Sequence, residues 1–187
     1  MLIIGNGLSR KKINLNKVHQ PKIGCNAIFR DLYVDHLVCC DKRMVKQAIN
    51  FHNNIYTRDR WFKDFTSSNV KPLPDLIKEG KDRKDDPFHW GSGPYAILLG
   101  ATLSNNINII GFDLYGSQGK VNNVYAGTDG YASPDKSAVD FSYWEYQIAK
   151  VFEWFPATRF TVYNTHDWLM PNRWKMANVS LDIIENL

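Results

Sequence analysis

The chain has 187 residues, of which 44% are hydrophobic and 22% charged, and a formal net charge of +4. This length suits a single domain with a sizeable core, and the composition excludes collagen-like, low-complexity and wholly disordered chains. No apolar run approaches the roughly 18–20 residues of a membrane-spanning helix, so we expect no membrane span. The mild positive charge suits an anionic ligand such as a nucleotide, but it is too small to indicate a nucleic-acid surface, and nucleic acid is not an expected partner.

Short apolar segments alternate with polar ones along the first half of the chain. They predict buried strands at residues 2–4, 22–29, 36–40 and 54–57, and a helix at residues 42–51. Residues 58–87 are charged and rich in proline, which favours a solvated loop or a lid inserted in the domain.

The second half begins with Ser92, which precedes Gly93, Pro94 and an apolar segment. This pattern predicts a helix with Ser92 or Gly93 as its N-cap and Pro94 in its first turn. Further along we expect a strand at 106–112, a loop at 116–134, an aromatic helix at 139–155, a last strand at 159–164 and a C-terminal tail at 165–187. The whole chain, residues 1–187, is therefore predicted to be one α/β domain with a mostly parallel sheet and helices on both faces.

Three cysteines, Cys25, Cys39 and Cys40, all lie in apolar, strand-like segments. An odd number cannot pair completely, so we expect buried free thiols in a reducing compartment, and we predict a cytoplasmic protein. The apolar run after Met1 is too short for a signal peptide. The sequence contains no CxxC or HExxH spacing, and no metal site is expected.

Polar residues follow the predicted strands where parallel sheets bind ligands, beyond their carboxyl ends. They are Gly5, Asn6, Gly7 and Ser9, then Asn26, Asp41, Gly91, Ser92, Gly93, Asp113 and Tyr115, and finally Asn164, Thr165 and His166.

Three of these features have both a binding and a purely structural interpretation. Gly5 and Gly7 carry no Cβ and so let the backbone approach a ligand, but a tight turn explains them too. Ser92 at a helix start can hold phosphate through free N–H groups and the helix dipole, although an ordinary N-cap would also be serine. Asp113 suits a contact with a ribose hydroxyl, and a turn is the alternative explanation.

These motifs, in this order, resemble the bacterial sialyltransferases of glycosyltransferase family 42 and related motility-associated glycosyltransferases. The family's first strand and G-N-G-P-S loop correspond to Ile3-Ile4-Gly5-Asn6-Gly7-Leu8-Ser9, where leucine replaces the proline. Its second-strand element corresponds to Cys25-Asn26-Ala27-Ile28-Phe29. Its S-G-x-Y helix start and its late strand correspond to Ser92-Gly93-Pro94-Tyr95 and Gly111-Phe112-Asp113-Leu114-Tyr115.

The resemblance implies a Rossmann-like three-layer sandwich that binds a nucleotide-sugar, with a CMP-sugar favoured, and needs no other cofactor. It implies that Asn6 and Asn26 contact the nucleotide and that Ser92 and Gly93 hold the donor. It also implies that Tyr115 steadies the leaving phosphate, and it matches a second tyrosine of the family to Tyr125. Preorganised donors of this kind are most valuable where charge develops on a leaving phosphate.

One departure concerns the catalytic base. The family has a histidine in the loop before the late helix, whereas residues 127–142 contain none and offer Asp129, Asp135 and Asp140. An aspartate needs a raised pKa to act as a base at neutral pH. His166 is a further candidate if the C-terminal tail folds back.

Three functions follow from this pattern. The first is a glycosyltransferase of bacterial or phage origin that moves a sugar from a nucleotide-sugar to a carbohydrate acceptor. The second is a non-catalytic nucleotide-binding module on the same fold, which the missing histidine favours. The third is a structural or assembly protein, such as a phage component or a homo-oligomer, for which the six tryptophans could supply a contact surface.

Overall fold

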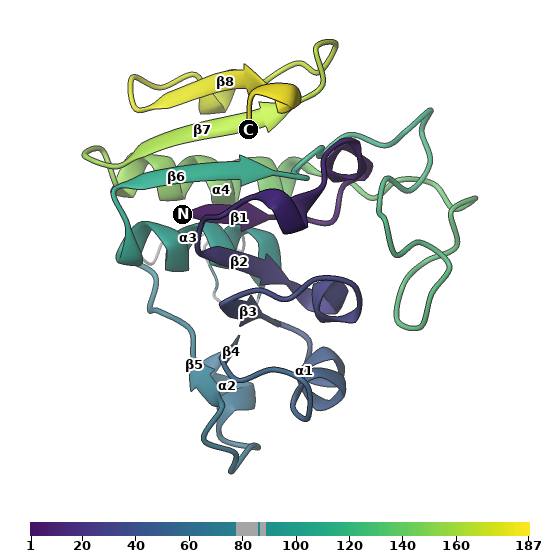
Figure 1. The fold of residues 1–187 in the computed structure, drawn as a ribbon, viewed down its shortest axis with the longest axis vertical. Helices are drawn as coiled ribbons and strands as arrows, with labels where there is room; N and C mark the ends of the chain where they lie inside the picture. The colour runs from purple at the N-terminus through teal and green to yellow at the C-terminus, as the bar shows by residue number, and fades with distance from the viewer. Residues whose placement is uncertain (78–85, 87–88) are drawn as a thin grey trace.

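The computed structural model describes residues 1–77, 86 and 89–187. Within this part of the chain, eight strands form one sheet in the order β5-β4-β3-β2-β1-β6-β7-β8 (Figure 1). Every neighbouring pair is parallel. The strands are β1 (Leu2–Ile4), β2 (Lys22–Cys25), β3 (His36–Val38), β4 (Ile55–Thr57), β5 (Val70–Pro72), β6 (Asn106–Ile110), β7 (Arg159–Asn164) and β8 (Val179–Ile183).

Helices cover both faces of the sheet and complete a Rossmann-like three-layer sandwich. Helices α3 (Ser92–Leu103) and α4 (Ser142–Trp154) pack on one face, in a core that includes Ile3 of β1. Helix α1 (Lys42–Ala48) and the 3-10 helix η3 (Asn26–Arg30) pack on the other face, with Leu2 and Ile4. The remaining helical elements include α2 (Asp59–Phe62) and the 3-10 turns η1 (Leu8–Lys12), η2 (Leu15–Lys17), η6 (Asn172–Trp174) and η7 (Ile184–Asn186). The predicted α/β class is therefore confirmed.

Helix α3 is apolar and buried from Pro94 to Ala101 because this part lies between the sheet and α4. It needs Gly100 for close packing, since a Cβ there would lie 2.6 Å from Cδ1 of Ile3. A helix buried on opposite sides has no polar face to present to solvent.

The order of the strands creates a switch point between β1 and β6. From β1 the chain builds strands outward to β5, and then returns to add β6, β7 and β8 on the other side. The segments after β1 and β6 therefore lie side by side at the carboxyl ends of the strands (Figure 1). This is where open parallel sheets leave a crevice for ligands.

The predicted loop at 58–87 is wrong for part of its length. Residues 59–62 form α2, and Val70–Pro72 form the edge strand β5, which pairs with β4. Leu73 and Leu76 are buried beside it. The proline-rich sequence does not predict this strand. It forms because its backbone groups pair with those of β4. Residues 78–85 and 87–88 of the expected lid lie outside the described residues.

The C-terminal segment is more ordered than a tail. Residues 179–183 form β8, which pairs along β7 and supplies the last strand of the sheet. Its alternation Val179-Ser180-Leu181-Asp182-Ile183 is a strand pattern that the sequence analysis missed. Trp168 and Trp174, before this strand, are both buried.

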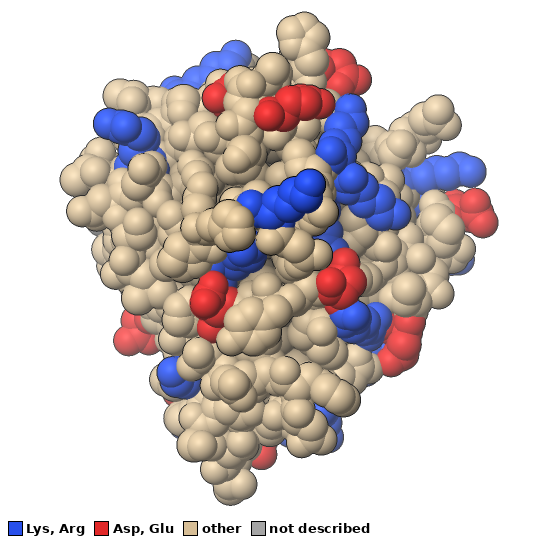
Figure 2. Space-filling view, in the orientation of Figure 1, with Lys and Arg blue, Asp and Glu red and all other residues tan. Residues whose placement is uncertain are grey.

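The surface carries no broad field of one sign in the view of Figure 2, where basic and acidic side chains are interspersed over neutral surface. No helix among the described residues is long and apolar enough to cross a membrane.

Candidate functional site

A cavity of about 280 Å³ opens at the switch point. Its walls come from five places: the ends of β1, β2 and β6 with the segments that follow them, the start of α3, and one side of α4. The lining residues are Gly5, Asn6, Gly7, Cys25, Asn26, Gly91, Ser92, Gly93, Pro94, Gly111, Phe112, Asp113, Leu114, Asn122, Asn123, Trp144 and Ile148. We call this cavity the switch-point cleft.

The glycines after β1 are required by contact with the segment after β6. A Cβ on Gly5 would lie 2.2 Å from the carbonyl oxygen of Gly111, and one on Gly7 would lie 2.4 Å from Cγ of Asp113. The N–H groups of Gly5 and Gly7 also donate to Ile110 and Gly111, each at 2.8 Å. Both glycines line the cleft, but their lack of a Cβ serves first to join the two segments.

Asn6 is buried in the wall of the cleft with half of its amide unused. Its Nδ2 donates to the carbonyl oxygen of Cys25 at 3.1 Å. Its Oδ1 is buried and has no hydrogen-bond partner among the described residues. A buried acceptor without a partner is costly, so this oxygen is suited to a donor from a ligand.

Asn26 ends β2 and turns the chain into η3. Its φ of 53° lies in the left-handed region, where asparagine is tolerated better than most residues, and this is why the predicted strand at 22–29 stops at Cys25. The hydroxyl of Ser92 donates to Oδ1 of Asn26 at 2.8 Å. The Nδ2 of Asn26 therefore stays available at the cleft, because no described residue accepts from it.

Ser92 is the first residue of α3 rather than its N-cap, which is Gly91. Its hydroxyl accepts from the N–H of Cys40 at 2.9 Å and donates to Asn26, so it ties α3 to the ends of β2 and β3. The expected capping role of Ser92 is therefore wrong. Its hydroxyl is committed to the neighbouring strands.

The first turn of α3 lines the cleft, and its first two backbone N–H groups have no acceptor among the described residues. These are the N–H groups of Ser92 and Gly93. In a helix of 12 residues the positive end of the dipole is at this turn. An anionic group is the ligand that such a turn binds best.

Asp113 forms the wall between the cleft and a second cavity of about 750 Å³. The N–H of Ser9 donates to Oδ2 of Asp113 at 2.9 Å, and the hydroxyl of Ser9 donates to Oδ1. Each carboxylate oxygen keeps further acceptor capacity, so Asp113 can still accept from a hydroxyl such as that of a ribose.

The thiols near the cleft are free and buried, as predicted. Burial raises the pKa of Cys25 to about 12 and also raises the pKa of Cys39 and Cys40. All three are thiols at neutral pH and are unsuited to act as nucleophiles. Within the described part of the chain, no group of three His, Cys, Asp or Glu residues could hold a metal ion.

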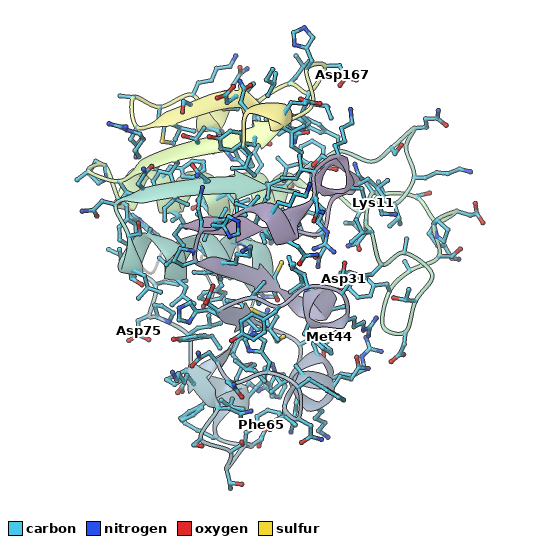
Figure 3. The ribbon with its side chains drawn as sticks, viewed as in Figure 1. Lys11, Asp31, Met44, Phe65, Asp75 and Asp167 are labelled. Carbon is cyan, nitrogen blue, oxygen red and sulfur yellow. The ribbon has the colours of Figure 1, made fainter. Side chains whose placement is uncertain are left out.

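Two tyrosines of the predicted site are occupied elsewhere. Tyr115 lines the larger cavity, and its hydroxyl donates to the carbonyl oxygen of Leu169 at 2.9 Å. Tyr125 donates to Asp31 and accepts from Nη2 of Arg10 at 2.8 Å, outside both cavities. Figure 3 labels Asp31, the residue that follows η3, near the carboxyl end of β2.

The three predicted catalytic residues do not line the cleft. His166 and Asp135 are exposed, and neither lines the switch-point cleft or the cavity beside it. Asp129 is exposed as well and accepts from Nε2 of Gln47 at 2.6 Å. The structure therefore brings Gly5, Asn6, Gly7, Asn26, Ser92, Gly93 and Asp113 together and leaves the three candidate bases apart.

Sequence reasoning missed Asn122 as a wall of the site. Its Oδ1 accepts from the N–H of Leu8 at 2.8 Å, and its Nδ2 donates to the carbonyl oxygen of Tyr115 at 3.1 Å. It therefore holds the long segment after β6 against η1. Nothing in the Gly/Asn/Ser-rich sequence around it separates this asparagine from its neighbours.

Comparisons of the chain with protein-family models, with curated proteins and with solved structures found no match. The geometry of the cleft and the order of the motifs along the chain are therefore what indicate a function.

Proposed function

We propose that the switch-point cleft binds the nucleotide part of a nucleotide-sugar, with a CMP-sugar favoured, and that the protein transfers the sugar to an acceptor. One observation carries this proposal. Ser92 and Gly93, whose N–H groups have no acceptor among the described residues, line a cavity whose other polar walls include the amides of Asn6 and Asn26.

The phosphate is placed at the first turn of α3. Among the described residues that line the cleft there is no lysine or arginine, so in this part of the chain backbone N–H groups and the helix dipole supply its positive potential. These donors are oriented before any ligand arrives. They therefore stabilise the charge that develops on a departing phosphate without reorganisation.

The two asparagine amides are placed to contact the base and the ribose. Oδ1 of Asn6 needs a donor, which an exocyclic amino group or a ribose hydroxyl supplies. Nδ2 of Asn26 offers a donor to a base or ribose oxygen. Asp113, whose carboxylate is held by Ser9, accepts from a sugar hydroxyl at the boundary with the larger cavity.

In the proposed transfer, the bond between the anomeric carbon and the phosphate oxygen breaks, and the phosphate keeps the electron pair. The acceptor hydroxyl oxygen forms the new bond to the anomeric carbon, and its proton passes to the departing phosphate. This route assigns no side-chain base, since His166, Asp129 and Asp135 lie outside the cleft.

The position of those three residues favours a second candidate function. A cleft with phosphate and base contacts that none of these three residues lines is also suited to a binding module that holds a nucleotide without turning it over. Consumption of donor distinguishes this module from a transferase.

Calorimetric titration with CMP, CDP, UDP and GDP tests the proposal. Asn26→Gly removes the amide and keeps the left-handed backbone that glycine adopts readily, while Ser92→Ala removes the hydroxyl that orients Asn26. We expect one nucleotide to bind selectively and Asn26→Gly to weaken it at least about tenfold, or 1.4 kcal/mol. Asn16→Ala, on the exposed turn η2, is the matched control and should leave binding unchanged.

Two results would overturn the proposal. One is the absence of binding by all four nucleotides, which would leave the fold as a scaffold for assembly. The other is equal binding by wild type and Asn26→Gly. If binding is as expected, donor consumption with an acceptor panel separates the transferase from the binding module.

A further inference from the structure

The larger cavity lies beside the switch-point cleft, beyond the ends of β1, β6 and β7. Its walls are η1, the start of the segment after β6, and residues 164–169 after β7. The lining residues are Leu8, Ser9, Lys12, Asp113, Tyr115, Gly116, Ser117, Asn122, Asn164, Thr165, Asp167, Trp168 and Leu169. Asp113 and Asn122 line both cavities, so ligands in the two would lie next to each other.

One wall of this cavity is aromatic, and the polar groups of its side chains already donate hydrogen bonds within the protein. The Tyr115 and Trp168 ring centroids lie 6.1 Å apart, and Phe141 packs edge-on against Tyr115 at 4.9 Å. The Trp168 indole N–H donates to the carbonyl oxygen of Asp113 at 2.8 Å, and the Tyr115 hydroxyl donates to Leu169. What remains for a ligand is ring surface, whose negative face attracts weakly positive C–H groups.

Asn164 adds a buried donor that lacks an acceptor. The residue is 2% exposed and lines the cavity, and its Oδ1 accepts from the N–H of Thr165 at 2.8 Å. Its Nδ2 has no partner among the described residues. An unpaired buried donor calls for an oxygen, which the hydroxyl or ring oxygen of a ligand can supply.

Two opposite charges, Lys12 and Asp167, complete the lining. Figure 3 labels Asp167 at the tip of the segment beyond β7 and Lys11, the neighbour of Lys12, on η1. The Thr165 hydroxyl, and to a smaller extent the Lys12 charge, lower the pKa of Asp167, which is therefore a carboxylate at neutral pH. A hydroxyl group can donate to this carboxylate and accept from the lysine, whereas an anion could pair only with the lysine and would be repelled by Asp167.

We infer that this cavity binds a neutral saccharide, whose C–H face packs on Tyr115 and Trp168 and whose hydroxyls pair with Lys12, Asn164 and Asp167. Its role as the acceptor rests on the proposed function, because only a donor in the adjoining cleft makes this saccharide a second substrate. The saccharide site itself does not depend on that function.

The test is an NMR titration of the ¹⁵N-labelled full chain, observing the Trp168 indole and the Asn164 amide signals. The probes are methyl β-D-galactopyranoside and methyl α-D-glucopyranoside, with methyl β-D-glucuronide as the anionic comparison. We expect a neutral glycoside to shift both signals in a saturable way and to bind at least about fivefold tighter than the glucuronide.

Two exposed substitutions and one matched control sharpen the titration. Lys12→Ala and Asp167→Asn should each weaken the neutral glycoside at least about threefold. Asp167→Asn should also reduce the discrimination against the glucuronide. Lys11→Ala, on the same turn but outside the lining, should leave binding unchanged.

Failure of this inference is distinguishable from failure of the proposed function. Shifts absent for both neutral glycosides, or tighter binding of the glucuronide, would overturn the saccharide site even if nucleotides bind. Asn26→Gly should leave glycoside binding intact. If this variant lost glycoside binding, the saccharide site would not be separate from the switch-point cleft. Glycoside binding without nucleotide binding would support this site and overturn the proposed function.

Discussion

The two flanks of the sheet, on either side of the switch point, are held together in different ways. Strands β1 to β5 have three or four residues each, while β6, β7 and β8 have five, six and five. Short parallel strands form few backbone ladder bonds. Their flank must obtain stability from another source.

On the short-strand flank, side chains at or just before the strands bond to backbone carbonyl groups of neighbouring segments. Thr57 is buried and donates from Oγ1 to the carbonyl oxygen of Cys39 at 2.8 Å. Nδ2 of Asn69 donates to the carbonyl oxygens of Ile49 and His52 at 2.7 and 2.8 Å. These bonds replace part of the ladder that strands of three residues cannot form.

On the long-strand flank, aromatic packing predominates. Phe152 of α4 lies 4.6 Å from Phe160 of β7 and 5.7 Å from Trp174, measured between ring centroids. Trp174 in turn lies 6.0 Å from Trp168, which lines the larger cavity. The comparison teaches that aromatic truncation should cost more on this flank than the loss of a hydrogen bond costs on the other.

The largest expected effect is that of Trp174→Ala. This side chain is fully buried, and its indole N–H donates to the carbonyl oxygen of Glu145 at 3.0 Å. We expect a loss of about 3–5 kcal/mol in the free energy of unfolding, measured by urea denaturation. Leu169→Ala, at a residue 77% exposed, is the control and should change stability by less than about 0.5 kcal/mol. A loss below about 1 kcal/mol for Trp174→Ala would contradict the aromatic account of this flank.

Next in size is Gly7→Ala, at the seam between the flanks. Gly7 has a φ of −65°, which alanine adopts freely, so any cost arises from the Cβ lying 2.4 Å from Cγ of Asp113. We expect about 1–3 kcal/mol of destabilisation in the same denaturation experiment.

A double variant tests that contact directly. Asp113→Ala removes the carboxylate that a Cβ on Gly7 would meet, so the cost of Gly7→Ala should be smaller in the Asp113→Ala background. Additive effects of the two substitutions would show that the clash is not with Asp113.

A smaller effect is expected for Thr57→Val on the short-strand flank. Valine keeps the shape of threonine but leaves the carbonyl oxygen of Cys39 without the hydroxyl donor. We expect a loss of about 1 kcal/mol in denaturation. Thr57→Ser retains the hydroxyl, and a cost for serine below that for valine would support the hydrogen bond. A larger cost for serine than for valine would show that Thr57 stabilises the fold mainly through the packing of its methyl group.

The last prediction concerns pH and the same flank. Burial lowers the pKa of His52 below its ordinary value of 6.5, and Nδ1 of its ring accepts from the N–H of Asn54 at 3.1 Å. The unfolded chain therefore binds the proton more readily than the folded one. The stability that neutral His52 contributes is present above pH 6.5 and is lost as the pH falls through the lowered folded pKa.

Thermal unfolding between neutral and acidic pH measures this effect. The expected result is a melting temperature that falls with pH in wild type and falls less in His52→Gln. The exposed His19→Gln serves as the control. An unchanged pH profile in His52→Gln would exclude His52 as a source, and His36, whose pKa burial also lowers, would be tested next.

The sequence by itself predicted the α/β class, the buried free thiols and the position of the cleft-lining polar residues at strand ends. Apolar runs such as 2–4 and 92–103 carry this information locally, because a buried strand or helix needs apolar side chains over its length. It also placed Asn6, Asn26 and Ser92 at the ends of neighbouring elements. In a parallel sheet the carboxyl ends of the strands lie together, so these residues are expected at the same end of the sheet.

Tertiary structure alone decided which of these residues meet and what each side chain does. The Ser92 hydroxyl is bound by Asn26 and Cys40 rather than by its own helix, and Tyr125 is drawn to Arg10 and Asp31. Strands β5 and β8 are defined by pairing with β4 and β7. Hydrogen-bond partners and edge pairing depend on distances between residues remote in sequence, whereas the apolar pattern of a strand or helix is carried by neighbours along the chain.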